Sequence, residues 1–262
     1  MKRVSTTLGV ARSNVIERRE GTRARRGPQE RAGDVELAST IRRLVDARPT
    51  YGSAPVNTKR VYRLMQKHGL LLERHTGRRR SREHEGQVAT IHSNCRWCSD
   101  GLEFTCWNGE VVRLAFALDC HDREVISWVA TTAGISGEMI RDMMLDCVEK
   151  RFGEIRAPHP VQWLSDNGSI FAAHKTIETA LALNLVPCFT PVESPESNGM
   201  AEALVKTFKR DYVRVNPIPN AAAALALIDS WMDDYNTMHP HSRLGYRSPR
   251  EYILSQPAAC PV

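Results

Sequence analysis

The sequence predicts an α/β fold in which a mixed five-stranded sheet is flanked by helices and preceded by a small basic helical segment. Three successive segments rich in Val, Ile, Leu, Phe and Trp are followed by alternating helix and strand patterns. Charge is divided unequally, because residues 1–86 carry 21 Lys and Arg against 9 Asp and Glu, whereas residues 87–262 carry 15 against 21. Net charges of +12 and −6 favour a polyanion-binding arm joined to a different functional unit, although a solvated, partly disordered basic tail is the alternative.

Composition excludes several classes of protein. The 262 residues are 42% hydrophobic, which is enough for one full core and a small second module. No apolar run approaches the roughly 18 residues of a membrane-spanning helix, and residues 1–20 lack the apolar stretch of a secretory signal. Seven cysteines without a dense disulfide pattern predict a reducing, cytoplasmic setting. The lack of a long apolar run predicts that the protein has no membrane partner. Cys95 and Cys98 lack a second Cys/His pair at zinc-finger spacing, so zinc is not favoured.

The first 87 residues predict a basic arm, a helical pair and a linker. Residues 1–33 are weakly apolar with a helical hint at 8–20, and residues 74–87 are linker-like. Between them, Asp34 is expected to cap one helix, and a second is expected to run from Asn57 to Gly69. Apolar positions recur at helical spacing at Leu37, Ile41, Leu44, Val45, Val61, Leu64, Met65 and, with them, His68. The outer face of the second helix offers Lys59, Arg60, Arg63 and Lys67, which suits DNA phosphates but equally an ordinary surface helix.

From residue 88 the pattern changes to that of a larger core extending to residue 255, followed by a short tail at 256–262. Strands are expected at 94–104, 111–119, 124–131, 161–165 and 186–190, and helices at 136–152, 172–183, 197–213 and 221–235. Asn108-Gly109 predicts a hairpin between the first two strands, because both residues tolerate positive φ. Asp119 and Asp122 are expected to form the next turn rather than to bind metal, whereas His239 and His241 receive no chemical role.

Three acidic residues stand at positions typical of a ligand site. Asp100 lies within the first strand, Asp166 directly follows the fourth, and Glu202 lies in the first turns of a helix. Strand ends and helix starts gather ligands in α/β sheets, and three carboxylates suit Mg²⁺ or Mn²⁺. Taken singly, each acid is better explained as a solvated or capping residue than as a metal ligand. Together they are more informative, and 35 residues separate Asp166 from Glu202.

The segments around these acids resemble the three motifs of the DDE integrase core. They are residues 97–100 (Trp-Cys-Ser-Asp), 165–169 (Ser-Asp-Asn-Gly-Ser) and 194–202 (Ser-Pro-Glu-Ser-Asn-Gly-Met-Ala-Glu). Lys209, seven residues after Glu202, matches the basic residue that often follows the glutamate. The chain is most similar to second-frame (OrfB) transposases of the insertion-sequence-three family, in its insertion-sequence-two branch. The resemblance covers most of residues 35–255, including residues 57–65 and 239–252.

The resemblance implies an RNase H-like core that cuts and joins DNA strands with two divalent ions, Mg²⁺ or Mn²⁺. Asp100, Asp166 and Glu202 would be both the catalytic residues and the metal ligands. Asn167 and Gly168 would turn the backbone beside a DNA phosphate. On the last catalytic helix, Lys206 and Lys209 share a face with Glu202 and would contact DNA, although a Glu–Lys surface pair is the simpler alternative.

The same resemblance implies the partners. These are double-stranded DNA at the element ends and the target, further copies of the chain, and the product of an upstream reading frame, at the bacterial nucleoid. In the family, that upstream product supplies the main site-recognition domain, and a further helix normally precedes the segment that begins at Asn57. Residues 53–56 take the place of that helix here. Two alternatives therefore stay open, a catalytically silent DNA- or transposase-binding modulator and a structure-selective nuclease.

Overall fold

The computed structural model describes residues 31–50, 58–72, 90–190 and 198–256. The chain divides into two compact units, Met1–Gly77 and Arg78–Val262. The first contains α3 (Asp34–Ala47) and α4 (Thr58–Lys67), and the second contains the sheet. The helical hint at residues 8–20, the start of the second helix at Asn57, the linker at 74–87 and the tail at 257–262 lie outside the described residues.

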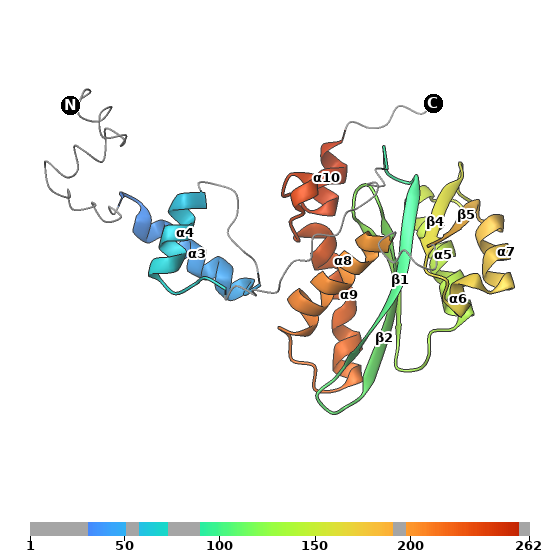
Figure 1. Ribbon diagram of the computed structural model, residues 1–262, viewed down its shortest axis with the longest axis horizontal. Coiled ribbons are helices and arrows are strands. Elements are labelled where there is room, and N and C mark those ends of the chain that lie inside the picture. The colour runs from blue at the N-terminus through green and yellow to red at the C-terminus, as the bar shows by residue number, and fades with distance from the viewer. Residues whose placement is uncertain (1–30, 51–57, 73–89, 191–197, 257–262) are drawn as a thin grey trace, which may run out of the picture. The chain divides into compact units, whose positions relative to one another are not determined.

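The larger unit is built on a mixed sheet of β1 (Arg96–Thr105), β2 (Val111–Asp119), β3 (Val125–Thr131), β4 (Val161–Ser165) and β5 (Leu185–Phe189). The strand order is β3-β2-β1-β4-β5. β1, β2 and β3 form an antiparallel meander, whereas β4 is parallel to β1 and β5 is parallel to β4. The predicted mixed five-stranded sheet flanked by helices is therefore confirmed (Figure 1).

Helices cover both faces of this sheet. In chain order they are α5 (Gly137–Phe152), α6 (Ser169–Ala172), α7 (His174–Ala182), α8 (Gly199–Phe208), α9 (Ala221–Thr237) and α10 (Pro249–Ser255). A π-helical turn, η2 (Lys209–Val213), continues α8, and a 3-10 turn, η3 (Ser242–Leu244), precedes α10. Figure 1 shows α8 and α9 on one side of β1 and β2, and α5 to α7 on the other.

The alternation of side chains along β1 divides the core into two layers. Trp97 packs with α5 and β4 residues in one cluster, whereas the next residue, Cys98, packs with residues of α8 and α9 in the other. Because successive side chains on a strand point to opposite faces, the even-numbered residues of β1 face α8. This places Asp100 on the same face of the sheet as the helix that carries Glu202.

The hairpin predicted from Asn108-Gly109 forms, but its turn is longer than two residues. Cys106 N donates to Glu110 O at 2.8 Å, and Gly109 N donates to Cys106 O at 3.0 Å. Gly109 alone takes a left-handed φ, at +90°. This is the pattern of a three-residue hairpin loop, in which one left-handed glycine follows a type I turn. The requirement for positive φ therefore falls on Gly109 and not on Asn108.

Long-range polar contacts attach the C-terminal helices to the sheet. The Asn236 amide, on α9, accepts from Val125 N at 2.8 Å and donates to Val125 O at 2.9 Å. These two bonds satisfy both backbone groups of the first residue of β3, as a neighbouring strand would. Arg250, on α10, pairs with Glu124 at 3.3 Å, directly before β3. The C-terminal residues are therefore an integral part of this unit.

The small unit has its own core, formed by Ile41, Leu64 and Met65. The α4 helix ends as predicted at Gly69, whose φ is +65°. Leu70 N donates to Met65 O and Gly69 N to Gln66 O, which is the Schellman pattern. The following predicted positions were wrong: Leu44 and His68 are exposed, and Asp34 caps no helix amide.

Within the described residues, no helix is long and apolar enough to cross a membrane.

Candidate active site

The register between β1 and β4 brings the first two acids together. Cys98 stands opposite Leu164 in this parallel pair. Asp100 and Asp166 each come two residues after this pair. Because the two strands are parallel, both acids lie at the same height along the strand direction. Asp100 stands between the buried residues Cys98 and Leu102 on one face of β1, and Asp166 follows the last residue of β4.

Asp100 is half-buried and electrostatically coupled to the other two acids. Burial is the largest effect and raises the pKa of its carboxyl, although a hydrogen bond from Gly101 N at 2.7 Å opposes this. The charges of Asp166 and Glu202 raise the pKa of Asp100 further. Asp166 and Glu202 therefore lie close enough to Asp100 for their charges to act on its carboxyl, an electrostatic environment that a bound cation would relieve.

A side chain that the sequence analysis missed holds the start of α8 against β1. Asn198 precedes α8 and is buried, and its Nδ2 donates to Ser99 O at 3.2 Å. Ser99 is the neighbour of Asp100, and Glu202 lies one turn into α8. The buried residues Ala201 and Leu204 pack the same helix on the sheet. Asn198 therefore fixes the distance between two of the acids; its place directly before the glycine that begins α8 was the only signal in the sequence.

A second amide fixes the segment around Asp166. Asn167 Nδ2 donates to Thr190 O at 2.8 Å, and Thr190 N donates to Ser165 O at 3.1 Å. Gly168 N donates to Asp166 Oδ1 at 3.0 Å. The φ of Gly168 is −56°, so the expected need for a sharp glycine turn is not what selects it. A Cβ there would lie 2.9 Å from Asp166 Oδ1, so the site requires the absence of a side chain.

The two lysines of the last catalytic helix differ in their surroundings. Lys206 Nζ lies 3.1 Å from Glu202 Oε2, in the i,i+4 pair that was the alternative to a DNA contact. Lys209 is half-buried and begins the π-helical turn η2. The α-helical bonding pattern extends to Lys209, whose N–H donates to Val205 O, and the π-helical turn begins only there, so the backbone alone does not decide where the Lys209 ammonium group points. A shared face of Glu202, Lys206 and Lys209 thus stays a prediction.

The donor chemistry of the site fits a hard divalent ion. Three carboxylates face one region, and the charges of two of them raise the pKa of the third. Within the part of the chain that the structure describes, no three His, Cys, Asp or Glu side chains are close enough together to enclose an ion. Residues 191–197, which lead into α8, lie outside that part.

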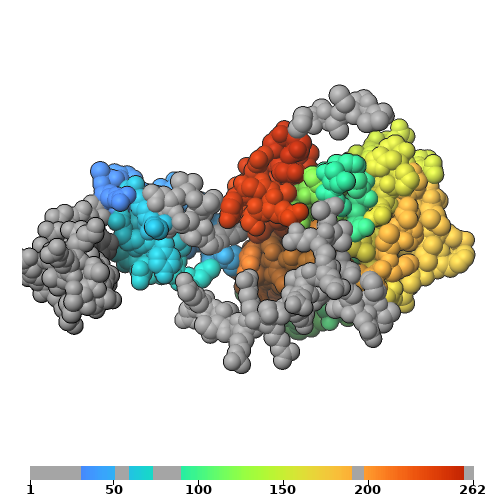
Figure 2. Space-filling model, turned by 45° about the horizontal axis from the view of Figure 1, so that its top comes forward, coloured from blue at the N-terminus to red at the C-terminus, as the bar shows by residue number. Residues whose placement is uncertain are grey.

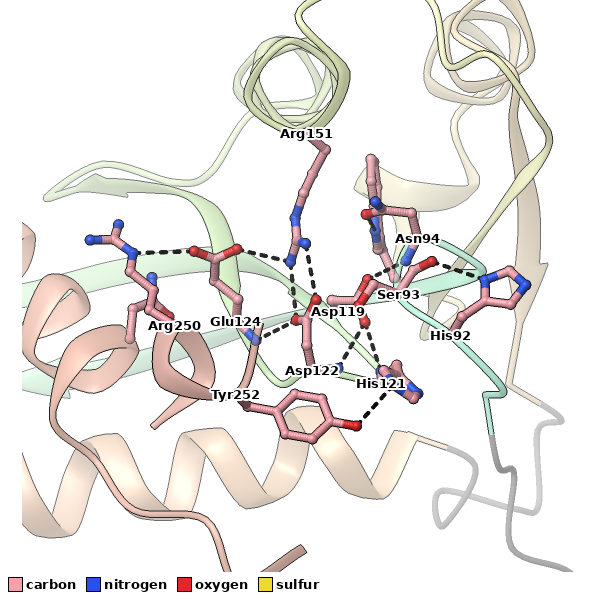
Figure 3. Close-up of polar contacts among 12 residues, drawn as sticks. His92, Ser93, Asn94, Asp119, His121, Asp122, Glu124, Arg151, Arg250 and Tyr252 are labelled. Carbon is pink, nitrogen blue, oxygen red and sulfur yellow. Dashed lines mark hydrogen bonds and ion pairs between the residues drawn. The ribbon is translucent and has the colours of Figure 1, made fainter. Parts of the chain in front are cut away.

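A second group of acidic residues lies in the β2–β3 turn and has a structural role, as predicted. Asp119 accepts from the backbone amides of Asn94, His121 and Asp122 at 2.7, 2.7 and 3.2 Å. The fully buried Asp122 carboxylate pairs with Arg151 at 3.0 Å, and the same guanidinium contacts Glu124 at 3.0 Å (Figure 3). Because these oxygens are already occupied, this group offers no vacant metal site.

The remaining candidates also have structural explanations. Cys95 Sγ contacts His92 Nδ1 at 2.9 Å, whereas Cys98 is fully buried on the sheet, so the two thiols do not form a metal pair. His239 stacks on Tyr235, and His241 packs edge-on against the same ring. Burial lowers the pKa of His241 to about 3, which keeps it neutral at physiological pH.

The predicted DNA-binding residues of the small unit fall into two groups. Arg60 and Arg63 both pair with Asp34, at 2.7 and 2.5 Å, and each guanidinium is about three-quarters buried. Lys59 on the same helix is exposed. Of the three, Lys59 has the side chain that is available without breaking an ion pair with Asp34.

Comparisons with known proteins agree with this geometry. Residues 92–195 and 185–249 match two family profiles, each described as an integrase core domain. The chain is 44% identical to the transposase InsD of insertion element IS2 of Escherichia coli, over 95% of this chain and 89% of that protein. It is 60% identical to an uncharacterised protein of insertion element IS136 of Agrobacterium fabrum, over 73% of this chain and 99% of the relative.

A solved structure supports the fold. The chain aligns with a chain of the simian T-cell lymphotropic virus intasome, solved in complex with the PP2A regulatory subunit B56 gamma, with a TM-score of 0.52 and 17% identity. The alignment covers 87% of this chain and 77% of that chain. The sequence identity over nearly the whole chain and the two profile matches show that this protein belongs to the integrase-core transposases of bacterial insertion elements.

Proposed function

We propose that this protein is the catalytic chain of an insertion-element transposase, which nicks DNA at the element ends and joins the freed 3′ ends to target DNA. The observation that carries the proposal is the coupling of Asp100 to the charges of Asp166 and Glu202 within an integrase-core family member. Metal-dependent phosphoryl transfer commonly uses such a carboxylate set.

Asp100, Asp166 and Glu202 would hold two divalent ions, Mg²⁺ or Mn²⁺. When bound, such ions supply Lewis-acid activation of the attacking oxygen and stabilisation of the leaving 3′ oxygen. The chain's own contribution is positional. Gly168 N holds the Asp166 carboxylate, Asn167 ties the segment after β4 to Thr190, and Asn198 holds the helix that carries Glu202 against β1. No serine, tyrosine or cysteine nucleophile is required, because the attacking oxygen belongs to water or to DNA.

Lys206 is expected to change partners during this cycle. In the structure it neutralises Glu202, to which it is joined at 3.1 Å, and its side chain is 76% exposed. If Glu202 binds a metal ion, it no longer pairs with Lys206. The Lys206 ammonium group then becomes free to contact a DNA phosphate on the side of the protein that carries the acids. Lys209 would contact the backbone further along. We also propose self-association, because each chain would supply one set of the three acids whereas an element has two ends. The product of the upstream reading frame is proposed as a further partner.

The test is a cleavage and strand-transfer assay on labelled element ends, with Mg²⁺ or Mn²⁺ and with EDTA. Asp166→Asn should abolish nicking and joining while leaving duplex affinity similar or higher, because a ligand and a negative charge are removed together. Asp142→Asn, which changes an exposed carboxylate on α5, is the matched control. Cleavage retained by Asp166→Asn would place the active centre elsewhere.

The same assay separates the alternatives. A structure-selective nuclease would nick in a metal-dependent manner but yield no joined product. A silent modulator would bind duplex without cutting it under any metal condition. The three acids favour the active enzyme, because a charge such as Asp100 is costly to keep half-buried in a strand without a use.

A further inference from the structure

A cavity of about 450 Å³ lies between the β2–β3 turn and the C-terminal segment. Its walls include His121 and Arg123 from the turn, Ser242 and Arg243 from η3, and Tyr252 from α10. None of the three catalytic acids lines it, and none of its lining residues is acidic. Figure 2 shows the C-terminal residues (red) beside the green residues around the start of β1. The cavity is therefore a cationic site distinct from the acid set.

Arg123 brings an uncompensated cation to this cavity. Its Nε is buried and has no hydrogen-bond acceptor, and no ion pair involves its side chain in the described residues. The acids nearest in sequence are already committed: Asp119 to backbone amides, and Asp122 and Glu124 to Arg151 (Figure 3). The Arg123 side chain lines the cavity, and no carboxylate of the described residues pairs with it, so the positive charge of its guanidinium would favour an anion in the cavity.

The opposite wall supplies a second cation and a fixed polar surface. Arg243 is exposed on η3, and within the described ranges no carboxylate pairs with it. His121 Nδ1 donates to Thr90 O at 3.0 Å, and its Nε2 accepts from the Tyr252 hydroxyl at 3.2 Å. These partners hold the imidazole in place. Two guanidinium groups around one cavity match an anion with several acceptor oxygens.

We propose that this cavity binds a backbone phosphate of duplex DNA, contacted by Arg123 and Arg243. The inference rests on the proposed function only for the identity of its ligand. Duplex DNA is favoured over a free anion because the cavity is larger than one phosphate requires and leaves room for the adjoining sugars. Residues 87–262 carry a net charge of −6, so the core needs local cationic contacts to hold a duplex at all. A phosphate held here would attach the DNA at a point other than the acids.

The experiment measures binding of a fluorescently labelled duplex to the full chain in EDTA, by anisotropy over a range of salt concentrations. Arg243→Gln should lower the salt slope by about 0.9 and weaken binding about eightfold at 0.1 M salt, equally for unrelated sequences. The matched control is Arg214→Gln, which removes an exposed arginine that does not line the cavity. Wild-type affinity in Arg243→Gln, or an equal loss in the control, would overturn the proposal.

Arg123 is tested by two variants, because Arg123→Gln can also disturb the turn. Urea unfolding identifies folded variants, and among these Arg123→Lys should retain more duplex affinity than Arg123→Gln. A second measurement tests whether the cavity binds a free anion: inorganic phosphate is added at constant ionic strength, and the stability of the protein is followed. Stabilisation of the wild type by phosphate, with duplex affinity unchanged in Arg243→Gln, would show a small-anion site and overturn the DNA assignment. These readouts need no catalysis, so failure of the cleavage assay would leave them unaffected.

Discussion

The backbone amide of Gly168 and the carboxylate of Asp166 form a contact that leaves no room for a side chain. The amide donates to Oδ1 at 3.0 Å, and a Cβ on Gly168 would stand 2.9 Å from the same oxygen. Since real Cβ atoms do not approach an oxygen so closely, any larger residue must displace the carboxylate. The orientation of Asp166, a proposed metal ligand, thus depends on a residue that has no side chain of its own.

Gly168→Ala is therefore expected to inactivate the protein without unfolding it. The methyl group should turn Asp166 away, and a ligand displaced by about 1 Å commonly costs on the order of 100-fold in rate. The measurement is nicking of an element end, together with thermal unfolding. Gly134→Ala is the control, because a Cβ at Gly134 meets nothing within 4 Å. Full activity in Gly168→Ala would mean that the loop relaxes freely.

Asp100→Asn should stabilise the metal-free protein at neutral pH. Burial and the charges of Asp166 and Glu202 raise the pKa of Asp100 in the folded state. A raised folded pKa gives stability that is present below the unfolded pKa, near 3.8, and is lost as pH rises through the folded value. The melting temperature of the variant in EDTA should thus exceed that of wild type at pH 7, and the gain should shrink toward pH 4. A gain that is equal at both pH values would contradict this origin.

Arg151→Met should destabilise the larger unit by about 3–5 kcal/mol, because it leaves the buried Asp122 without its cation. Arg151 and Asp122 are 10% and 0% exposed, so water cannot replace the lost partner. Lys150→Met, next to it in α5, is the control. Its pair with Asp146 is nearly half exposed, and the loss should stay within about 1 kcal/mol. Urea unfolding measures both, and similar losses would show that Asp122 finds other partners.

In the small unit, Lys59→Gln and Arg60→Gln should have different effects. Lys59 is exposed, so its loss should lower the salt slope of duplex binding by about 0.9 with little change in stability. Arg60 pairs with Asp34, so its loss should chiefly weaken protection of α3 and α4 from amide hydrogen exchange. Unchanged salt slopes in both variants would mean that this helical pair is not a DNA surface.

The bounds of helices and strands were predicted most accurately for elements that have one or both faces apolar. The strands at 111–119 and 161–165 have the predicted bounds, because their mostly apolar runs end at Asp119 and before Asp166. The three acids were singled out from motif spacing, and their role stays a prediction. What escaped prediction depends on partners distant in the chain, as in the amide contacts of Asn167 with Thr190 and of Asn198 with Ser99. Periodicity carries no information about such pairings.

Errors in the small unit have a different cause. Leu44 was expected to be buried from its helical spacing but is 59% exposed, because two short helices bury only a narrow stripe. Asp34 was expected to cap its own helix, yet it accepts from Arg31 N and pairs with two arginines of α4. A capping preference is local, and two guanidinium groups outweigh it.

The attachment of α9 and α10 to the start of β3 has a consequence for how the enzyme is made. The contacts of Val125 with Asn236, Glu124 with Arg250 and His121 with Tyr252 span 111, 126 and 131 residues. Contacts of such separation close late, after the loops between them have paid their ordering entropy. During synthesis, the start of β3 therefore lacks these partners until the residues from 236 to 252 have left the ribosome. A chain that stops before Asn236 would thus carry all three acids and still lack the contacts that attach α9 and α10 to the sheet.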